Sequence, residues 1–256
     1  MTGERAEDRR ILRVTGADRS GFLQGLVTND VRKLDRGPVY AAILTPQGKY
    51  LADFLMLAAP DAILIDVRAD VAEALLRRLQ MYRLRADVQI APADLHVTRG
   101  LGTPPEGAVQ DPRHAALGWR LYGTEPGEAP QIDWDGIRVA NCIPETGIEL
   151  IPEQTFILEA GFERLAGVDH RKGCYVGQEV TARMKHKTEL RKGLVTVHVE
   201  GPAQPGDAIT AEGRPAGTLH TRSGDRAIAY LRFDRATGPM QAGEATIRWA
   251  DAETLA

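Results

Sequence analysis

The residue pattern of the chain changes at Leu194, and this change constrains the fold more than any other feature of the sequence. Leu194 to Val199 alternate, as expected for a strand with one buried face. Further short apolar runs follow, separated by turns rich in glycine and proline: 208–210, 216–220, 227–231 and 245–249. Short strands at regular intervals are typical of a small antiparallel barrel or sandwich. We therefore expect an all-β C-terminal lobe.

The preceding part of the chain mixes strand-length runs with helical periodicity. Apolar runs of strand length occur at 11–14, 40–44, 51–57, 62–67 and 88–90. One helix is expected after Asp18, and a second one near Asp70 places Val71, Leu75 and Leu79 on one face. The resulting β-α-β-β-α-β order indicates a ferredoxin-like or related lobe.

The segment between this lobe and Leu194 combines loops with short strands and helices. Residues 100–130 hold many glycines and prolines, which predicts loops and short strands. We expect a turn and a strand over Asp133 to Ala140, and a helix from Pro152 through Leu158. Another helix is expected to begin near Gly177. The fold class predicted for the whole chain is therefore α+β.

Charge and cysteine content exclude several classes of protein. The 256 residues carry a net charge of -3, whereas a sequence-independent nucleic-acid binder usually carries a basic surplus. The two cysteines, Cys142 and Cys174, form no C-x-x-C pair. A cluster or structural zinc site usually needs about four thiolate or imidazole ligands. We therefore expect no metal site within one chain, and the net charge disfavours a nucleic-acid partner.

The N-terminus gives an expectation about localisation. Residues 1–8 are charged and include no apolar core of a signal peptide. No apolar run approaches the ~20 residues that span a bilayer. The sequence therefore predicts a cytoplasmic protein without a membrane partner.

The segment around Cys174 is the main candidate for chemistry. Arg171 and Lys172 precede the cysteine, and the expected helix begins a few residues after it. Nearby cations and a helix N-terminus both favour the thiolate form of a cysteine. Two interpretations stay open at this point: a functional thiol, or a buried cysteine in an ordinary loop, since free cysteine is often buried.

The segment also carries a family resemblance. Lys172-Gly173-Cys174-Tyr175-Val176-Gly177-Gln178-Glu179, followed by Thr181-Ala182-Arg183, resembles the signature of the YgfZ-type folate-binding proteins. This family includes a mitochondrial iron–sulfur assembly factor. Further segments are similar to other motifs of the family: 16–19, 22–25, 28–31, 44–49, 82–85 and 143–145.

The resemblance implies a fold and a function. The family shares its fold with the aminomethyltransferase of the glycine cleavage system, in which three lobes surround a central tetrahydrofolate site. By this analogy, residues 11–95 form a ferredoxin-like lobe, residues 1–10 and 96–190 a second α+β lobe, and residues 191–256 the β-barrel. The implied function is a tetrahydrofolate-binding accessory protein for assembly, maturation or repair of iron–sulfur enzymes. Its partners would be iron–sulfur assembly proteins or client enzymes, and no settled turnover reaction is implied.

The resemblance also suggests site residues. The functional thiol would be Cys174, supported by Lys172, Gln178 and Glu179. For folate, Asp53 and Glu159 are the carboxylates expected to read the amide-like edge of the pterin. Other contacts would bind the glutamate tail or form walls for the ring: Asn29, Tyr82, Arg171 and Tyr175.

Two alternative functions stay open. The first is a folate-dependent one-carbon transferase or demethylase, although only Asp53 remains where the transferase typically has paired acids. The second is a binding protein linked to RNA modification, suggested by the basic clusters at 183–187 and 191–192. The acidic net charge of the chain disfavours it.

Overall fold

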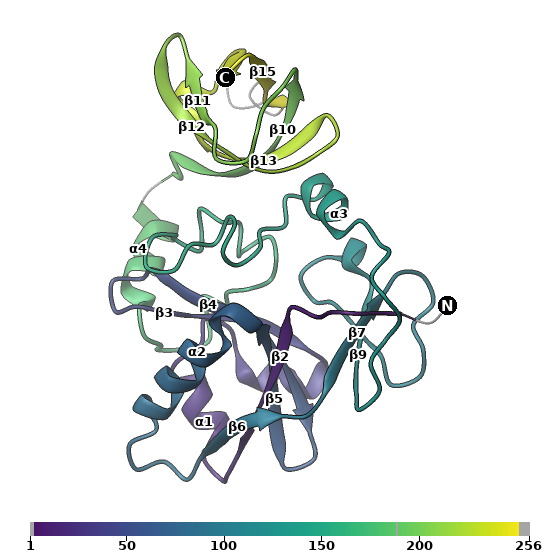
Figure 1. Ribbon diagram of the computed structural model, residues 1–256. Coiled ribbons are helices and arrows are strands. Elements are labelled where there is room, and N and C mark those ends of the chain that lie inside the picture. Colours follow the sequence, from purple (N-terminus) through teal and green to yellow (C-terminus); the bar gives the residue numbers. More distant parts are fainter. Residues whose placement is uncertain (1–2, 188, 251–256) are drawn as a thin grey trace. The chain divides into compact units, whose positions relative to one another are not determined.

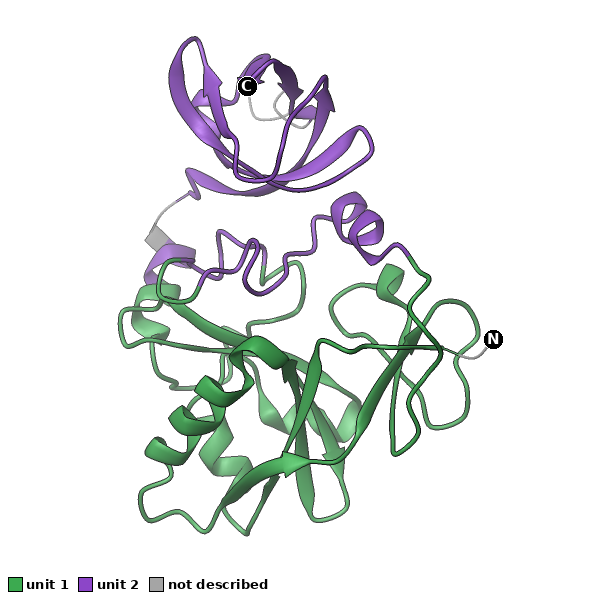
Figure 2. Ribbon diagram, in the orientation of Figure 1, with its two compact units in different colours: residues 1–132, 152–154, 162–182 green, residues 133–151, 155–161, 183–256 purple. Residues whose placement is uncertain are grey.

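The computed structural model describes residues 3–187 and 189–250, which divide into two compact units (Figure 2). Unit 1 comprises residues 1–132, 152–154 and 162–182, and unit 2 comprises residues 133–151, 155–161 and 183–256. The ends of the predicted lobes at residues 1–2 and 251–256 lie outside the described residues. No helix within the described ranges is long and apolar enough to cross a membrane.

An antiparallel sheet forms the centre of unit 1 (Figure 1). Its described strands lie in the order β3 (Val39–Leu44), β4 (Tyr50–Ala59), β5 (Ala62–Arg68), β2 (Arg9–Thr15) and β6 (Gln89–Ala93). Two α-helices and a 3-10 helix belong to the same segment: α1 (Arg19–Gln24), α2 (Ala69–Tyr82) and η1 (Val31–Arg36). The sequence predicts every strand of this sheet. However, three strands lie between α1 and α2, one more than in the expected β-α-β-β-α-β order.

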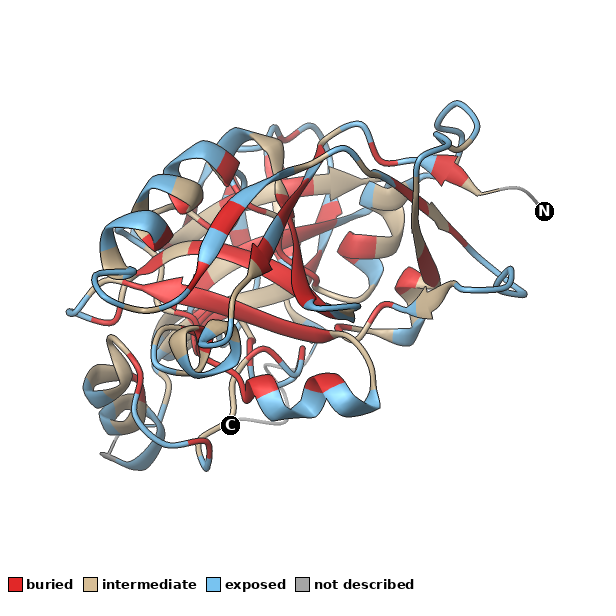
Figure 3. Ribbon diagram, turned by 90° about the horizontal axis from the view of Figure 1, so that it is seen from below, coloured by how far each residue is buried: buried red, intermediate tan, exposed pale blue. Residues whose placement is uncertain are grey.

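Burial explains why these residues form this sheet. All residues of β3 are buried, and β4 and β5 are buried along most of their length (Figure 3). Helix α2 is amphipathic, and its buried face of Ala72, Leu75 and Leu79 joins the same core. The apolar spacing that predicted this helix therefore corresponds to its packing face.

A second, smaller sheet of unit 1 contains the start of the described chain. Its strands lie in the order β1 (Glu4–Arg5), β7 (His96–Gly100), β9 (Trp119–Gly123) and β8 (Val109–Gln110). A short 3-10 helix, η2 (Ala115–Leu117), precedes β9. Glu4 pairs with Arg99 and Arg5 with Thr98, so the N-terminal tail is held by a strand that follows it by more than 90 positions. The division into three lobes at the predicted boundaries stays a prediction.

A buried charge network joins the two sheets of unit 1. Asp66 of β5 accepts hydrogen bonds from Arg9 Nε at 2.6 Å and from Arg120 Nη1 at 2.9 Å. Arg120 also donates from Nε to Asp111 at 2.9 Å, and Asp111 pairs with Arg113 at 2.8 Å. Burial alone would raise the pKa of Asp66, but the charges of Arg9 and Arg120 outweigh it and lower that pKa. The network is therefore charged and paired.

Unit 2 is built around a closed antiparallel barrel (Figure 1). Its strands follow the order β10 (Lys192–Glu200), β13 (Arg226–Arg232), β12 (Arg214–Ser223), β11 (Ala208–Ala211), β14 (Met240–Ala242) and β15 (Ala245–Arg248). The 3-10 helix η3 (Phe233–Arg235) follows β13. Val197, Leu219 and Ile247 are among the fully buried core residues. The barrel and the mixed architecture confirm the predicted fold class.

Two local predictions about secondary structure are wrong. Residues expected to form a strand after Asp133 form helix α3 (Trp134–Ala140), because the Asp133 side chain accepts a hydrogen bond from Gly136 N at 2.8 Å and caps the helix. The helix expected from Pro152 through Leu158 is replaced by turns. The helix expected near Gly177 is present as α4 (Gln178–Lys187).

Candidate functional site

Lys172 anchors the loop that carries the signature. Its Nζ donates to the carbonyl oxygens of Gln24 at 2.5 Å and Val27 at 2.7 Å, at and beyond the end of α1. Burial lowers the pKa of Lys172 to about 8, while Asp30, Asp169 and Cys174 act in the opposite direction. The ammonium group therefore holds the loop against α1, where carbonyl groups at a helix end favour a cation.

Cys174 is exposed, in contrast to the anchor two residues before it. Gly173 between them has a φ of +90°, and a side chain at this position would meet no atom within 4 Å. Helix α4 begins four positions after the cysteine, at Gln178. Of the two interpretations of Cys174 from the sequence, the buried one does not hold, and its function stays a prediction.

Tyr175 packs inside the loop, against the side chain of Lys172. It is buried, and the Lys172 Nζ lies 4.8 Å from the centre of its ring. Burial raises the pKa of its hydroxyl. Its carbonyl accepts a hydrogen bond from Gln178 N at 3.2 Å, which connects the loop to the start of α4.

Two glycines fix the loop against the turn between β3 and β4. Gly177 has a φ of +85°, and a Cβ there would lie 2.6 Å from the carbonyl oxygen of Thr45. Gly48 has a φ of +75°, and a Cβ there would lie 2.8 Å from the Cβ of Val180. Because neither position has room for a side chain, the signature segment and this turn form one packed element.

Asp53 is a buried carboxylate of unit 1 that is held by two tyrosines. Tyr40 OH donates to its Oδ2 at 2.9 Å, and Tyr50 OH donates to its Oδ1 at 2.7 Å. Burial, followed by the charge of Asp53, raises the pKa of Tyr40 well above its usual value. The Tyr40 ring stacks on Phe162 with centroids 5.1 Å apart, and the Arg113 guanidinium lies 5.6 Å from the same ring. Asp53 therefore has a fixed orientation.

The two tyrosines that hold Asp53 are missing from the residues chosen from the sequence. Tyr50 lies only three positions before Asp53 in the same strand, and Tyr40 lies in the neighbouring strand of the β3–β4 hairpin. A signal was therefore available, because both lie within the hairpin that holds Asp53. In the sequence alone, however, both tyrosines are equally compatible with ordinary aromatic residues of the core.

Asn29 is a buried residue whose side chain forms four hydrogen bonds within unit 1. Its amide nitrogen donates to the carbonyls of Tyr40 at 2.8 Å and Ala166 at 2.6 Å. Its oxygen accepts from Asp30 N at 2.8 Å and Lys33 Nζ at 2.9 Å. These bonds use the full donor and acceptor capacity of the amide. The folate contact expected for Asn29 stays a prediction.

The other candidates of unit 1 lie at the surface or are partly buried. Tyr82 is the half-buried last residue of α2, and within the described residues no ring contact or hydrogen bond connects it to Asp53. Arg171 is exposed, and its backbone N–H donates to Asp169 at 2.8 Å. Gln178 and Glu179 form the first turn of α4. The structure thus brings together Lys172, Cys174 and Tyr175, but not Tyr82.

Glu159 lies in unit 2, on a turn that packs on the barrel. It is buried, and its Oε2 accepts a hydrogen bond from Tyr230 OH at 2.7 Å. Lys192 Nζ lies 3.8 Å from Oε1. Burial, followed by the bond to Glu159, raises the pKa of Tyr230. No local pattern in the sequence predicts the Tyr230 contact, because the two residues are 71 positions apart.

The structure offers no built metal site in the part of the chain that it describes. No group of three or more His, Cys, Asp or Glu side chains there could hold a metal ion.

Comparison with known proteins extends these observations. Residues 191–255 match the family model of the CAF17 C-terminal beta-barrel domain. The mitochondrial iron–sulfur cluster assembly factor IBA57 of Mus musculus is 32% identical, over 92% of this chain and 79% of the relative. The protein of the same name from Homo sapiens is 29% identical over the same shares of each chain. A homologue from Pyricularia oryzae is 30% identical, over 94% of this chain and 69% of the relative.

A solved structure supports the fold independently. The aminomethyltransferase T of the glycine cleavage system from Bartonella henselae superposes with a TM-score of 0.76. The match covers 97% of this chain and 85% of the other at 12% identity. At this identity the likeness shows the fold alone, and it confirms the aminomethyltransferase-like architecture.

The relatives correct one prediction. Those from mouse, human and Pyricularia oryzae are named as mitochondrial proteins. This contradicts the cytoplasmic localisation expected from the N-terminus. That expectation used the absence of a targeting pattern, and such an absence does not identify a compartment.

Three observations point to the same family: the identity to the mouse protein over most of both chains, the signature at residues 172–179, and the match of the barrel to the family model. The chain belongs to the IBA57 family of iron–sulfur cluster assembly factors, the YgfZ-like family that its signature resembles.

Proposed function

We propose that the protein binds a tetrahydrofolate and assists iron–sulfur cluster assembly through the thiol of Cys174. The names of the relatives support the assembly role, and the fold of the aminomethyltransferase supports the folate. One observation carries the proposal for the thiol. Cys174 is exposed on a loop whose anchor, Lys172, is buried and bonded to the carbonyls of Gln24 and Val27.

The chemistry of the thiol follows from its exposure. A thiolate is the form of cysteine that attacks and ligates metals. Cys174 can therefore bind iron transiently, form a mixed disulfide or take up a one-carbon unit. With two cysteines in the chain, a resident cluster with about four protein ligands is not available. The natural partners are iron–sulfur assembly proteins or client enzymes that supply the remaining ligands.

The carboxylates fit the chemistry of a pterin. A pterin presents donors and an acceptor along an amide-like edge, and an ionised carboxylate has about four acceptor sites. Glu159 accepts a hydrogen bond at Oε2 from the hydroxyl of Tyr230, and Lys192 lies beside its other oxygen. Asp53, oriented by Tyr40 and Tyr50, is the candidate in unit 1. The exposed guanidinium of Arg171 suits the glutamate tail.

The role of the thiol is tested by Cys174→Ala, with Cys142→Ala as the control. Because Cys174 is exposed, the Cys174 variant should keep the folding stability and folate affinity of the wild type. In cells that lack the endogenous factor, Cys174→Ala should fail to restore the activity of cluster-containing enzymes, whereas Cys142→Ala should restore it. Full restoration by Cys174→Ala would overturn the role of the thiol.

The folate is tested separately by titration of the purified protein with tetrahydrofolate. Glu159→Gln and Asp53→Asn should each weaken binding by about ten-fold, the loss of one charge-assisted hydrogen bond. Absence of binding by the wild type would overturn the folate proposal and leave the thiol proposal in place. Turnover of a methylamine donor, lost in Asp53→Asn, would support the one-carbon transferase instead.

A further inference from the structure

The barrel carries a pocket with a strongly cationic lining. The pocket has a volume of about 440 Å³, and its lining residues come from β10, β12, β13, η3 and the residue before β10. Four of its lining side chains are basic: Arg191, Lys192, Arg232 and Arg235. None of the described residues that line it is acidic. The chain as a whole has a net charge of -3, so general basicity does not explain the pocket.

Two of the cations are held in place by the barrel. Arg235 Nη1 donates to the carbonyl oxygen of Pro215. Lys192 Nζ lies 3.8 Å from Glu159 and 5.5 Å from the centre of the Tyr230 ring. These contacts keep two positive charges at the pocket without a ligand.

The other two cations are available for a ligand. The Arg191 side chain is exposed, and it forms no hydrogen bond or ion pair with another described residue. In the part of the chain that the structure describes, Arg232 pairs only with Asp234, at 3.3 Å, and both side chains are about half exposed. Exposed pairs of this kind are weak and screened by salt, so an anion can compete for Arg232.

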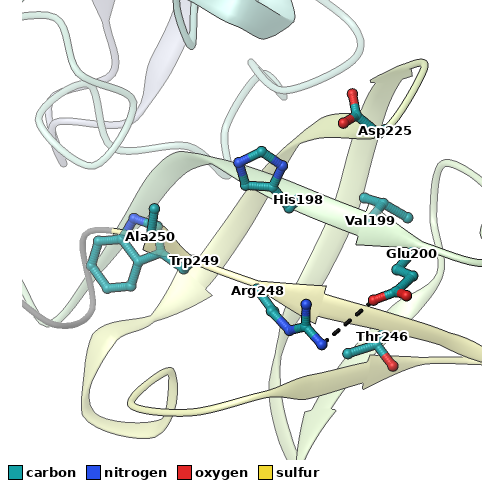
Figure 4. Close-up of a pocket in the computed structure, with 8 residues that line it drawn as sticks. All are labelled: His198, Val199, Glu200, Asp225, Thr246, Arg248, Trp249 and Ala250. Carbon is teal, nitrogen blue, oxygen red and sulfur yellow. Dashed lines mark ion pairs between the residues drawn. The ribbon is translucent and has the colours of Figure 1, made fainter.

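A second pocket on the same barrel provides a comparison. It has a volume of about 490 Å³ and is lined by His198, Glu200, Asp225 and Arg248 among others (Figure 4). Figure 4 shows Arg248 turned toward Glu200, and their charged atoms lie 3.5 Å apart. Acidic and basic charges are mixed in this pocket. A lining whose charged residues are all basic is therefore a property of the first pocket and is not shared by the second one.

We infer that the cationic pocket binds a small polyanion with two or more closely spaced carboxylate or phosphate groups. Arginine forks bind both groups in a bidentate manner. A ligand with one anionic group would neutralise only some of the four positive charges, so a ligand with several is expected. The volume of the pocket lies within the range of ~300–1,000 Å³ that is usual for small-ligand pockets. The glutamate tail of a folate would supply carboxylates, and a nucleotide or inorganic polyphosphate would supply phosphates. The four cations of the pocket carry this inference whether or not the protein binds folate.

The test uses the full chain and two probes, a γ-linked triglutamate peptide and inorganic tripolyphosphate. Each is titrated by calorimetry at about 0.15 M salt, where long-range attraction between exposed charges is screened. The double variant Arg191→Gln/Arg232→Gln removes the two available cations. The control Arg226→Gln/Arg248→Gln removes two exposed arginines of the same barrel that lie outside this pocket.

At least one probe should bind the wild type with one site per chain. The pocket double variant should lose about ten-fold or more in affinity for it, and the control should stay within about two-fold. The probe that binds more tightly identifies carboxylate or phosphate as the group recognised. Binding of neither probe, or an equal loss in both double variants, would overturn the inference.

Discussion

At the scale of single residues, Lys172 combines burial with a charge. Its ammonium group replaces water with two carbonyl oxygens, and burial leaves its pKa at about 8 against a reference of 10.5. The folded protein thus gives up this proton more easily than the unfolded chain does. Lys172 therefore anchors the signature loop, and its lowered pKa makes the stability of the protein depend on pH.

The free energy of unfolding should rise with pH between about 8 and 10.5, the folded and unfolded pKa values of Lys172. Below the folded pKa, Lys172 is protonated in both states. Above it, unfolding takes up a proton, which disfavours the unfolded state as pH rises toward 10.5. Urea denaturation of the wild type and Lys172→Met at several pH values measures this slope. The Lys172→Met variant should lack the part of this slope that is due to Lys172. Identical slopes in the two proteins would show that Lys172 does not cause the pH dependence.

Tyr50→Phe should reduce stability by about 1–3 kcal/mol, because the buried Asp53 loses a hydroxyl donor at 2.7 Å. Tyr82→Phe is the control, since the described residues include no hydrogen bond to its hydroxyl. Thermal unfolding of both variants measures the difference. If Asp53 also orients a folate, Tyr50→Phe should weaken tetrahydrofolate binding, and an unchanged affinity would remove Asp53 from the proposed site.

At the scale of elements, the contact between the signature loop and the β3–β4 turn depends on glycine. Gly177→Ala should destabilise the protein more than Gly173→Ala, although both positions have positive φ. The backbone cost of about 1–2 kcal/mol applies to both. Only at Gly177 would the new Cβ meet a carbonyl oxygen, at 2.6 Å. Melting temperatures of the two variants test this, and an equal loss would mean that the contact contributes nothing.

The sequence predicts elements with strong local signals and fails where distant contacts decide. The spacing of Leu75 and Leu79 predicts α2, and alternation predicts β10. Residues 134–140 carry strand-like residues, yet the Asp133 cap makes them helical. In the site, the signature identifies Cys174 and its loop. It cannot reveal that Lys172 bonds to residues near position 25 or that Tyr230 holds Glu159, because both contacts bridge long stretches of chain.

At the scale of the whole molecule, each unit has its own core and its own buried charge network. In unit 1, Arg120 bridges Asp66 and Asp111. In unit 2, Glu149 accepts from Arg138 at 2.6 Å and from Thr221 Oγ1 at 2.5 Å, which joins the segment after α3 to the barrel. Neither network shares a residue with the other. Breaking a buried pair by removing one partner costs about 3–5 kcal/mol.

This arrangement predicts selective unfolding. Arg120→Met should accelerate amide hydrogen exchange in β2, β5 and β9, whereas Glu149→Gln should accelerate it in α3, β10 and β12. The reason is that each substitution removes a partner from a buried network confined to one unit, so the free energy of opening falls mainly there. Hydrogen exchange read by mass spectrometry resolves the peptides of each unit. A uniform increase across both units in either variant would show that the two units unfold as one cooperative block and would refute this division of stability.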